Sequence, residues 1–249
     1  MKPWLKYIVF GLLAYLLFLI IRFPASIAYR WVEKEMQPIT LSAVSGTVWS
    51  GHADGILLRG SDLGKMDWRF SPLALLGAKL GFVFEVSGPR LHAEGTGGVT
   101  LGGTAYFAPI NGVMDAGLLE TVPRFRVGKI KGNLEYRLEE LELSKDGHVL
   151  SVNGKALWKG AGIVQPITLS LGDVDITLTS DNGDIIAEFS GEGALTLDGQ
   201  TIIEPDGRFT VNGFVLPRPS APPALVAALR SFGKETPGGK IELDYTGRL

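Results

Sequence analysis

The chain has 249 residues, 45% of them hydrophobic, so it can bury a sizeable core in one domain or two small ones. Its formal net charge of −2 at pH 7 leaves no basic surplus for neutralising phosphates, which argues against a nucleic-acid partner. The absence of cysteine excludes disulfides, thiol catalysis, cysteine-ligated zinc and lipoprotein acylation.

Residues 1–23 predict a transmembrane anchor. Two lysines precede an apolar run over 7–21, and these fifteen residues span only about 22 Å, short of a bilayer core of roughly 30 Å. The span therefore has to include Trp4, Leu5 and Phe23 as well. The lysines favour a cytoplasmic N-terminus, which would make this a single-pass membrane protein with the remaining chain on the opposite side of the membrane.

A cleaved signal peptide is the alternative interpretation, because small residues at 26–28 follow the apolar run at a suitable distance. Residues 24–38 then predict a juxtamembrane helix with a proline at both ends. Its apolar side chains, Trp31 among them, share one face, which makes 25–35 a candidate partner surface. The plainer interpretation is a helix that packs across the end of a sheet.

The segment over 41–72 has the most distinctive order of residues. Two apolar stretches flank Asp54-Gly55, which predicts a hairpin with its tight turn at this dipeptide. The chain also resembles the type II secretion system protein N family in the order and spacing of five residues. They are Gly46, Trp49, Gly51, Trp68 and Pro72.

Residues 39–249 are predicted to form a β domain, because apolar and polar residues alternate along them as in strands with one dry face. The family resemblance implies that this domain lies in the periplasm and that the single-pass anchor lies in the cell inner membrane. The expected strands include 82–86, 134–138, 141–143, 167–171, 176–179 and 241–245. Turns are expected at Asn111-Gly112, Asp146-Gly147, Asn182-Gly183, Asp198-Gly199 and Asp206-Gly207. Such short connections join strands antiparallel, and about a dozen strands are expected.

Two short helices are expected over 73–80 and 224–232. They are too small to cover the apolar faces of so many strands. We therefore predict a mainly β protein whose antiparallel sheet folds on itself as a roll, a sandwich or a curved groove.

The sequence offers no catalytic constellation. His52, His92 and His148 are not at metal-ligand spacing from one another, and no nucleophile elbow, zinc helix or phosphate loop is present. We therefore expect no enzyme activity, no cofactor and no metal.

The family resemblance implies a non-enzymatic accessory component of the type II secretion system, which Gram-negative bacteria use to export folded proteins across the outer membrane. It implies the inner-membrane platform proteins as partners, with the outer-membrane secretin as a further candidate. The family is also distantly similar to AsmA-like and lipopolysaccharide-bridge proteins, whose β grooves carry lipids.

A periplasmic lipid- or hydrophobe-binding groove is thus the alternative function. Its candidate lining residues are Trp49, Trp68, Phe82, Phe84, Leu169 and Leu178. The same side chains would form an ordinary dry core if the face is closed. As partner surfaces we expect the helix that carries Trp31 and a free edge strand over 240–245 that carries Tyr245.

Overall fold

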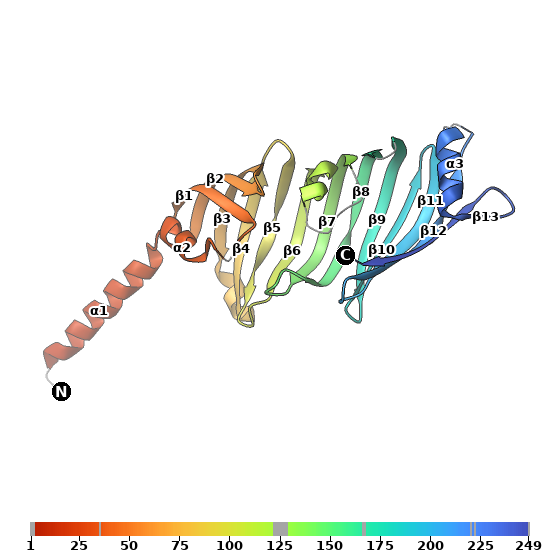
Figure 1. The fold of residues 1–249 in the computed structure, drawn as a ribbon. Coiled ribbons are helices and arrows are strands. Elements are labelled where there is room, and N and C mark those ends of the chain that lie inside the picture. The colour runs from red at the N-terminus through yellow and green to blue at the C-terminus, as the bar shows by residue number, and fades with distance from the viewer. Residues whose placement is uncertain are drawn as a thin grey trace.

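The computed structural model describes residues 3–34, 36–121, 129–165, 168–219, 221 and 223–248. Within these residues, three α-helices, two 3₁₀ helices and fourteen strands form one continuous body (Figure 1). The helices are α1 (Pro3–Ile21), α2 (Ala25–Val32), η1 (Pro72–Gly77), η2 (Ala116–Thr121) and α3 (Pro223–Phe232).

The strands make a single antiparallel sheet. They are β1 (Ile39–Gly46), β2 (Ser50–Leu58), β3 (Ser61–Ser71), β4 (Lys79–Ser87), β5 (Leu91–Thr100), β6 (Ala105–Asp115), β7 (Lys129–Leu143), β8 (Val149–Gln165), β9 (Leu169–Asp181), β10 (Asp184–Glu192), β11 (Leu195–Ile203), β12 (Arg208–Pro217), β13 (Lys234–Glu235) and β14 (Ile241–Arg248). Each strand pairs with the next along the chain as far as β12, which pairs with β14, and β13 lies outside β14. The prediction of a mainly β, antiparallel protein is confirmed.

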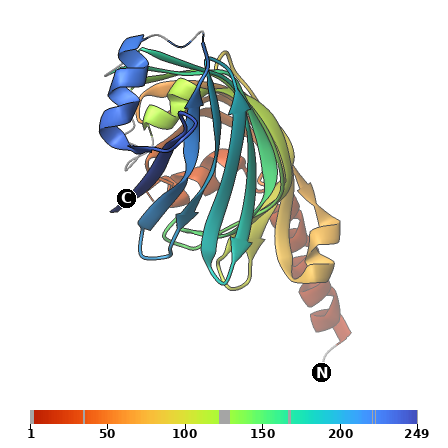
Figure 2. The same cartoon turned by 90° about the vertical axis from the view of Figure 1, so that its right-hand side faces the viewer.

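The sheet is bent into a half-pipe, which is seen end-on in Figure 2. β-bulges interrupt the register between β2 and β3, β5 and β6, β7 and β8, and β8 and β9. A β-bulge adds twist and bends its strand, which favours a curved sheet. Within the described residues, η2 and α3 lie on the hollow side, where a sandwich would have a second sheet.

The predicted transmembrane anchor is wrong. Among the residues that the structure describes, no helix combines the length and the apolar character that a membrane crossing requires. The prediction needed Phe23 to lengthen the span, but α1 ends at Ile21. The chain then turns, and the Phe23 carbonyl accepts a hydrogen bond from the Val48 amide at 3.1 Å.

The short helices are only partly as predicted. α3 lies where the sequence indicates. The helix predicted over 73–80 is instead a short 3₁₀ helix, η1, and β4 begins two residues after it. α2 ends at Val32, well before residue 38, and Glu35, part of the predicted partner helix, lies outside the described residues. Ile167, which was expected to begin a strand, also lies outside them.

Three of the predicted turns are wrong. Asp54-Gly55 lies inside β2, Asn111-Gly112 inside β6 and Asp198-Gly199 inside β11. A Cβ on Gly112 would come within 2.5 Å of the Tyr136 hydroxyl, and one on Gly199 within 2.9 Å of the Phe189 ring. These two glycines make room for rings on the neighbouring strand. The other three dipeptides do lie between strands.

Two groups of buried side chains form the core. The N-terminal cluster consists of Ile56, Leu63, Val86, Ala93 and Leu118. The C-terminal cluster consists of Ala161, Val174, Leu195, Leu197, Val215 and Leu225. Since Leu118 belongs to η2 and Leu225 to α3, η2 covers the N-terminal cluster and α3 covers the C-terminal cluster.

Candidate functional site

The two faces of the sheet differ in chemistry. One row of directly paired residues crosses the hollow side, and we call this side the apolar face. The row consists of Phe84, Gly95, Ile110, Leu138, Gly154, Leu178 and Ala187. The adjacent row points to the other side, the polar face. It consists of Glu85, Glu94, Asn111, Arg137, Lys155, Thr177 and Glu188.

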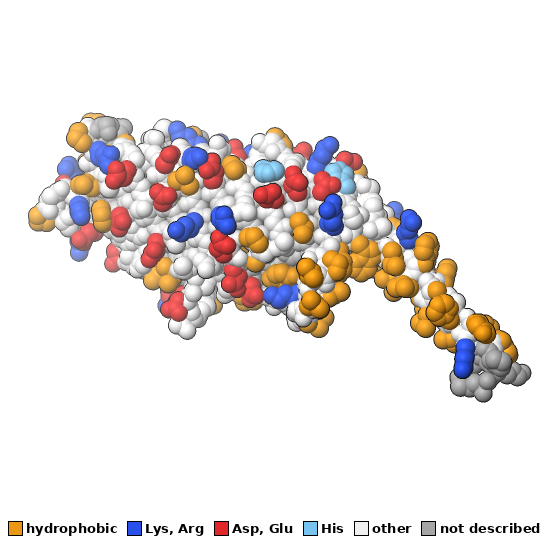
Figure 3. Space-filling view, turned by 180° about the vertical axis from the view of Figure 1, so that it is seen from behind, with side chains coloured by type: hydrophobic (Ala, Val, Ile, Leu, Met, Phe, Trp, Pro, Cys, Tyr) orange, Lys and Arg blue, Asp and Glu red, His pale blue; other side chains and the backbone are white. Residues whose placement is uncertain are grey.

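Charged side chains of both signs are spread over the polar face (Figure 3). Three shallow depressions lie on it, of about 480 Å³, 600 Å³ and 520 Å³. Asp175 contributes to the first two. Carboxylates, amides and hydroxyls line most of the second, whereas cationic and apolar side chains such as Arg137 and Leu157 also line the first. The second depression therefore has a different chemistry from the hydrophobe groove that the sequence predicts.

Aromatic rings lie opposite glycines at several places on the apolar face. The pairs are Trp68 with Gly51, Phe107 with Gly97, Tyr136 with Gly112, Phe189 with Gly199 and Phe209 with Gly247. A Cβ added to any of these glycines would meet the opposite side chain at 2.3 to 2.9 Å. Each ring therefore requires its glycine, which accounts for five of the 33 glycines.

The predicted groove-lining residues divide into three sets. Trp68, Phe82, Phe84 and Leu178 are half-buried on the apolar face. Leu169 packs against the C-terminal cluster, beside the residues that α3 covers. Trp49 lies outside the strands, in the turn between β1 and β2.

The family-pattern residues build the junction between the helices and the sheet. Gly46 has a φ of 84°, which begins the turn, and Gly51 lies against the Trp68 ring. Trp49 Nε1 donates to the Ile20 carbonyl at 2.7 Å, and Trp68 Nε1 donates to the Val48 carbonyl at 3.3 Å. The end of α1 is thereby fixed to the first hairpin.

The residues predicted to meet partners are on the surface. The Trp31 side chain is 71% exposed on α2, and that of Tyr245 is 61% exposed on β14. Pro72 begins η1, whose Leu73 and Leu76 are even more exposed. These leucines were not predicted as a partner surface, although three leucines within four positions after Pro72 were a usable signal.

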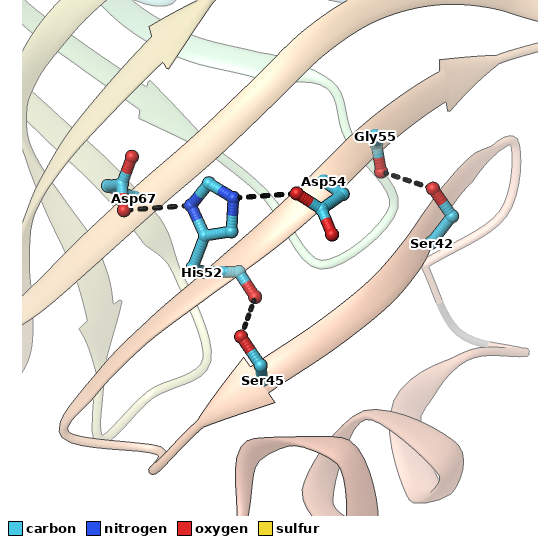
Figure 4. Close-up of polar contacts among 6 residues, drawn as sticks. All are labelled: Ser42, Ser45, His52, Asp54, Gly55 and Asp67. Carbon is cyan, nitrogen blue, oxygen red and sulfur yellow. Dashed lines mark hydrogen bonds and ion pairs between the residues drawn. The ribbon is translucent and has the colours of Figure 1, made fainter.

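A polar cluster on β2 and β3 was not predicted from the sequence (Figure 4). His52 Nδ1 lies 2.8 Å from Asp67 Oδ1, and Nε2 lies 3.1 Å from Asp54 Oδ1. The hydrogen bond with Asp67, and then that with Asp54, raises the pKa of His52 above 6.5. Because both ring nitrogens are engaged, the arrangement favours a charged, fixed imidazolium and not a free base.

His52 gives a pH-dependent contribution to stability whose sign follows from the raised pKa. The stabilisation is fully present below the unfolded-state pKa of 6.5 and is lost as the pH rises through the folded-state pKa. We expect His52→Gln to lower Tm slightly at about pH 5.5 and to leave it unchanged at about pH 9, as measured by circular dichroism. His148→Gln, in the β7–β8 turn, is the control and should give no such pH-dependent difference in Tm.

Comparison with known proteins decides the family. The family model described as type II secretion system, protein N, matches residues 37–244, which include the sheet from β1 to within β14. The chain belongs to the type II secretion system protein N family. It is therefore a component of the type II secretion system.

Three relatives named type II secretion system protein N match over nearly the whole chain. The one from Aeromonas hydrophila is 28% identical and covers 96% of both chains. The one from Klebsiella pneumoniae is 26% identical over 94% of this chain and 91% of its own, and the one from Vibrio cholerae is 24% identical over 92% of both. No solved structure matches the chain.

Proposed function

We propose that the protein is a non-enzymatic accessory component of the type II secretion system, which acts in the periplasm at the inner membrane. It would aid the export of folded proteins across the outer membrane. The observation that carries this proposal is the family match, because it extends over nearly the whole sheet, from β1 into β14. The proposed partners are the inner-membrane platform proteins, with the secretin as a further candidate.

α1 supports a position at the membrane. Its large side chains from Tyr7 to Ile21 are all exposed, with Tyr7 at 79% and Phe10 at 73%. Exposed apolar surface of this extent marks a site of contact with a membrane or with another protein. We propose that α1 contacts the inner membrane, and that the β domain over 39–249 is the part that meets periplasmic partners.

Deletion of the gene tests the secretion role. We expect an enzyme exported by this system to accumulate in the periplasm, and expression of the full chain from a plasmid should restore its release. The measurement is the enzyme's activity in medium, periplasm and cytoplasm, and fractionation should find the protein with the inner membrane. A secretin deletion gives the fully blocked level. Unchanged export without the gene would contradict the role.

A second function, hydrophobe binding, is favoured by the open side of the sheet. Leu138 and Leu178 are half-buried on the apolar face and belong to neither cluster. Within the described residues, the hollow side has short helices where a sandwich would have a second sheet. We therefore propose that an acyl chain can lie along this central stretch, and that the protein uses it within the secretion system.

A further inference from the structure

The two edges of the sheet differ in which elements cover them (Figure 1). Along the β1 edge, the Leu41 amide donates to the Tyr29 hydroxyl of α2 at 2.8 Å, and Pro24 forms a bridge with Thr47. At the other edge, β13 pairs only with Ile241 and Glu242. In the described part of the chain, no strand pairs with the outer side of β14 over 244–248.

The hydrogen bonds of the β13–β14 hairpin show which backbone groups of β14 point outward. The Thr236 amide donates to the Lys240 carbonyl at 2.8 Å, so Lys240 directs its backbone groups toward β13. In an antiparallel strand this direction alternates from residue to residue. Asp244, Thr246 and Arg248 therefore direct their N–H and C=O groups away from β12, toward any strand that arrives at this edge.

We propose that the exposed segment 244–248 pairs antiparallel with the same segment of a second copy of the chain, centred on Thr246. In this register Asp244 lies opposite Arg248 of the second copy, and the pair occurs twice by symmetry. Oppositely charged side chains directly across an antiparallel ladder stabilise it. All three outward-facing residues then form hydrogen-bonded pairs.

The apolar side of the segment fits the same register. Tyr245 would lie opposite Gly247 of the second copy, which repeats the aromatic–glycine pairing found along the sheet. Gly247 already lies against Phe209 on its inner side, so it would have a ring on both sides. Gly97 has this arrangement within the chain, since it pairs with Phe82 on β4 and with Phe107 on β6.

Two competing assemblies fit less well. Pairing centred on Tyr245 would place Arg248 opposite Glu242, but Lys234 of β13 already occupies that position. Pairing of β14 with β1 of another copy would build an open fibre, but α2 occupies the β1 edge. The contact is therefore isologous and closes as a dimer, and its two-fold axis keeps both apolar faces on one side of a continuous sheet.

Charge exchange tests the register. The full chain is purified in a non-ionic detergent, and its mass is followed against concentration by sedimentation equilibrium. We expect a dimer, which Asp244→Arg or Arg248→Asp weakens by about tenfold because each converts two attractions into repulsions. The double variant Asp244→Arg/Arg248→Asp should restore dimerisation. Glu188→Arg, on the polar face of β10, is the control and should leave the mass unchanged.

Two further variants test the edge itself. Thr246→Pro removes an outward N–H and leaves the hydrogen bonds to β12 in place, so the dimer should be lost while circular dichroism is unchanged. Since the chain has no cysteine, Thr246→Cys should give a disulfide-linked dimer on mild oxidation, and Thr179→Cys, on β9, should not. A monomeric wild-type chain would overturn the proposal. So would a dimer that none of the β14 variants affects, or linkage of Thr246→Cys to a different protein in cells.

Discussion

Trp68→Ala is expected to lower the free energy of unfolding by about 3 kcal/mol, at the lower end of the range for a large aromatic side chain because the ring is half-buried. The substitution removes the ring that lies against Gly51 and the hydrogen bond to the Val48 carbonyl. It therefore weakens both the β2–β3 pair and the junction that holds α1. The measurement is urea unfolding followed by far-ultraviolet circular dichroism.

Trp31→Ala is the matched control, since the same side chain is removed from a position that is 71% exposed. It should change the free energy of unfolding by less than about 0.5 kcal/mol. Wild-type stability of Trp68→Ala would mean that the ring is not part of the core. In that case Trp68 would belong with residues that serve a bound molecule and not the fold.

The alternation of apolar and polar residues was sufficient to predict a mainly β chain, but not the number and length of its strands. The predicted strands 134–138 and 141–143 both lie in β7, and 176–179 lies in β9 together with the end of 167–171. The same pattern left the role of each glycine open. Asp-Gly and Asn-Gly dipeptides favour turns locally, but Gly112 and Gly199 are needed opposite Tyr136 and Phe189. That requirement depends on which strands are neighbours and in what register. It therefore overrides the local turn preference at positions that the sequence by itself does not identify.

Local sequence pattern was also insufficient to predict how the candidate site residues are placed. Trp49 and Trp68 look equivalent in the sequence, yet only Trp68 lies in a strand, and Trp49 meets the end of α1. The spacing of His52 and Asp54 indicates a shared face. Asp67 joins them because the β2–β3 register places it opposite His52.

The predicted edge strand was close to the surface that the structure exposes. The free edge was predicted over residues 240–245, but β13 pairs with the first part of β14. The exposed part is displaced toward Arg248. A two-residue strand such as β13 leaves no alternation to detect, so the sequence could not have shown this displacement.

The degree to which the apolar face is covered separates the two proposed functions. A photoreactive amino acid at Phe84 or Leu178, incorporated in cells, is expected to form adducts with phospholipid or lipopolysaccharide. Both positions are half-buried on the apolar face. Half-burial leaves each position within reach of an acyl chain, and apolar lining favours its transfer from water. The measurement is mass analysis of the purified adducts.

Glu188 is the matched control, because it lies on β10 next to this row but on the polar face. Lipid adducts there at the same level would mean unspecific contact with the membrane. If lipid is absent at both Phe84 and Leu178 while export still requires the protein, the apolar face is closed and the chain acts through protein contacts alone. Lipid adducts at both positions in the otherwise unchanged chain, together with loss of export and of the Phe84 adduct when Leu178→Asp is introduced, would make hydrophobe binding part of the secretion mechanism.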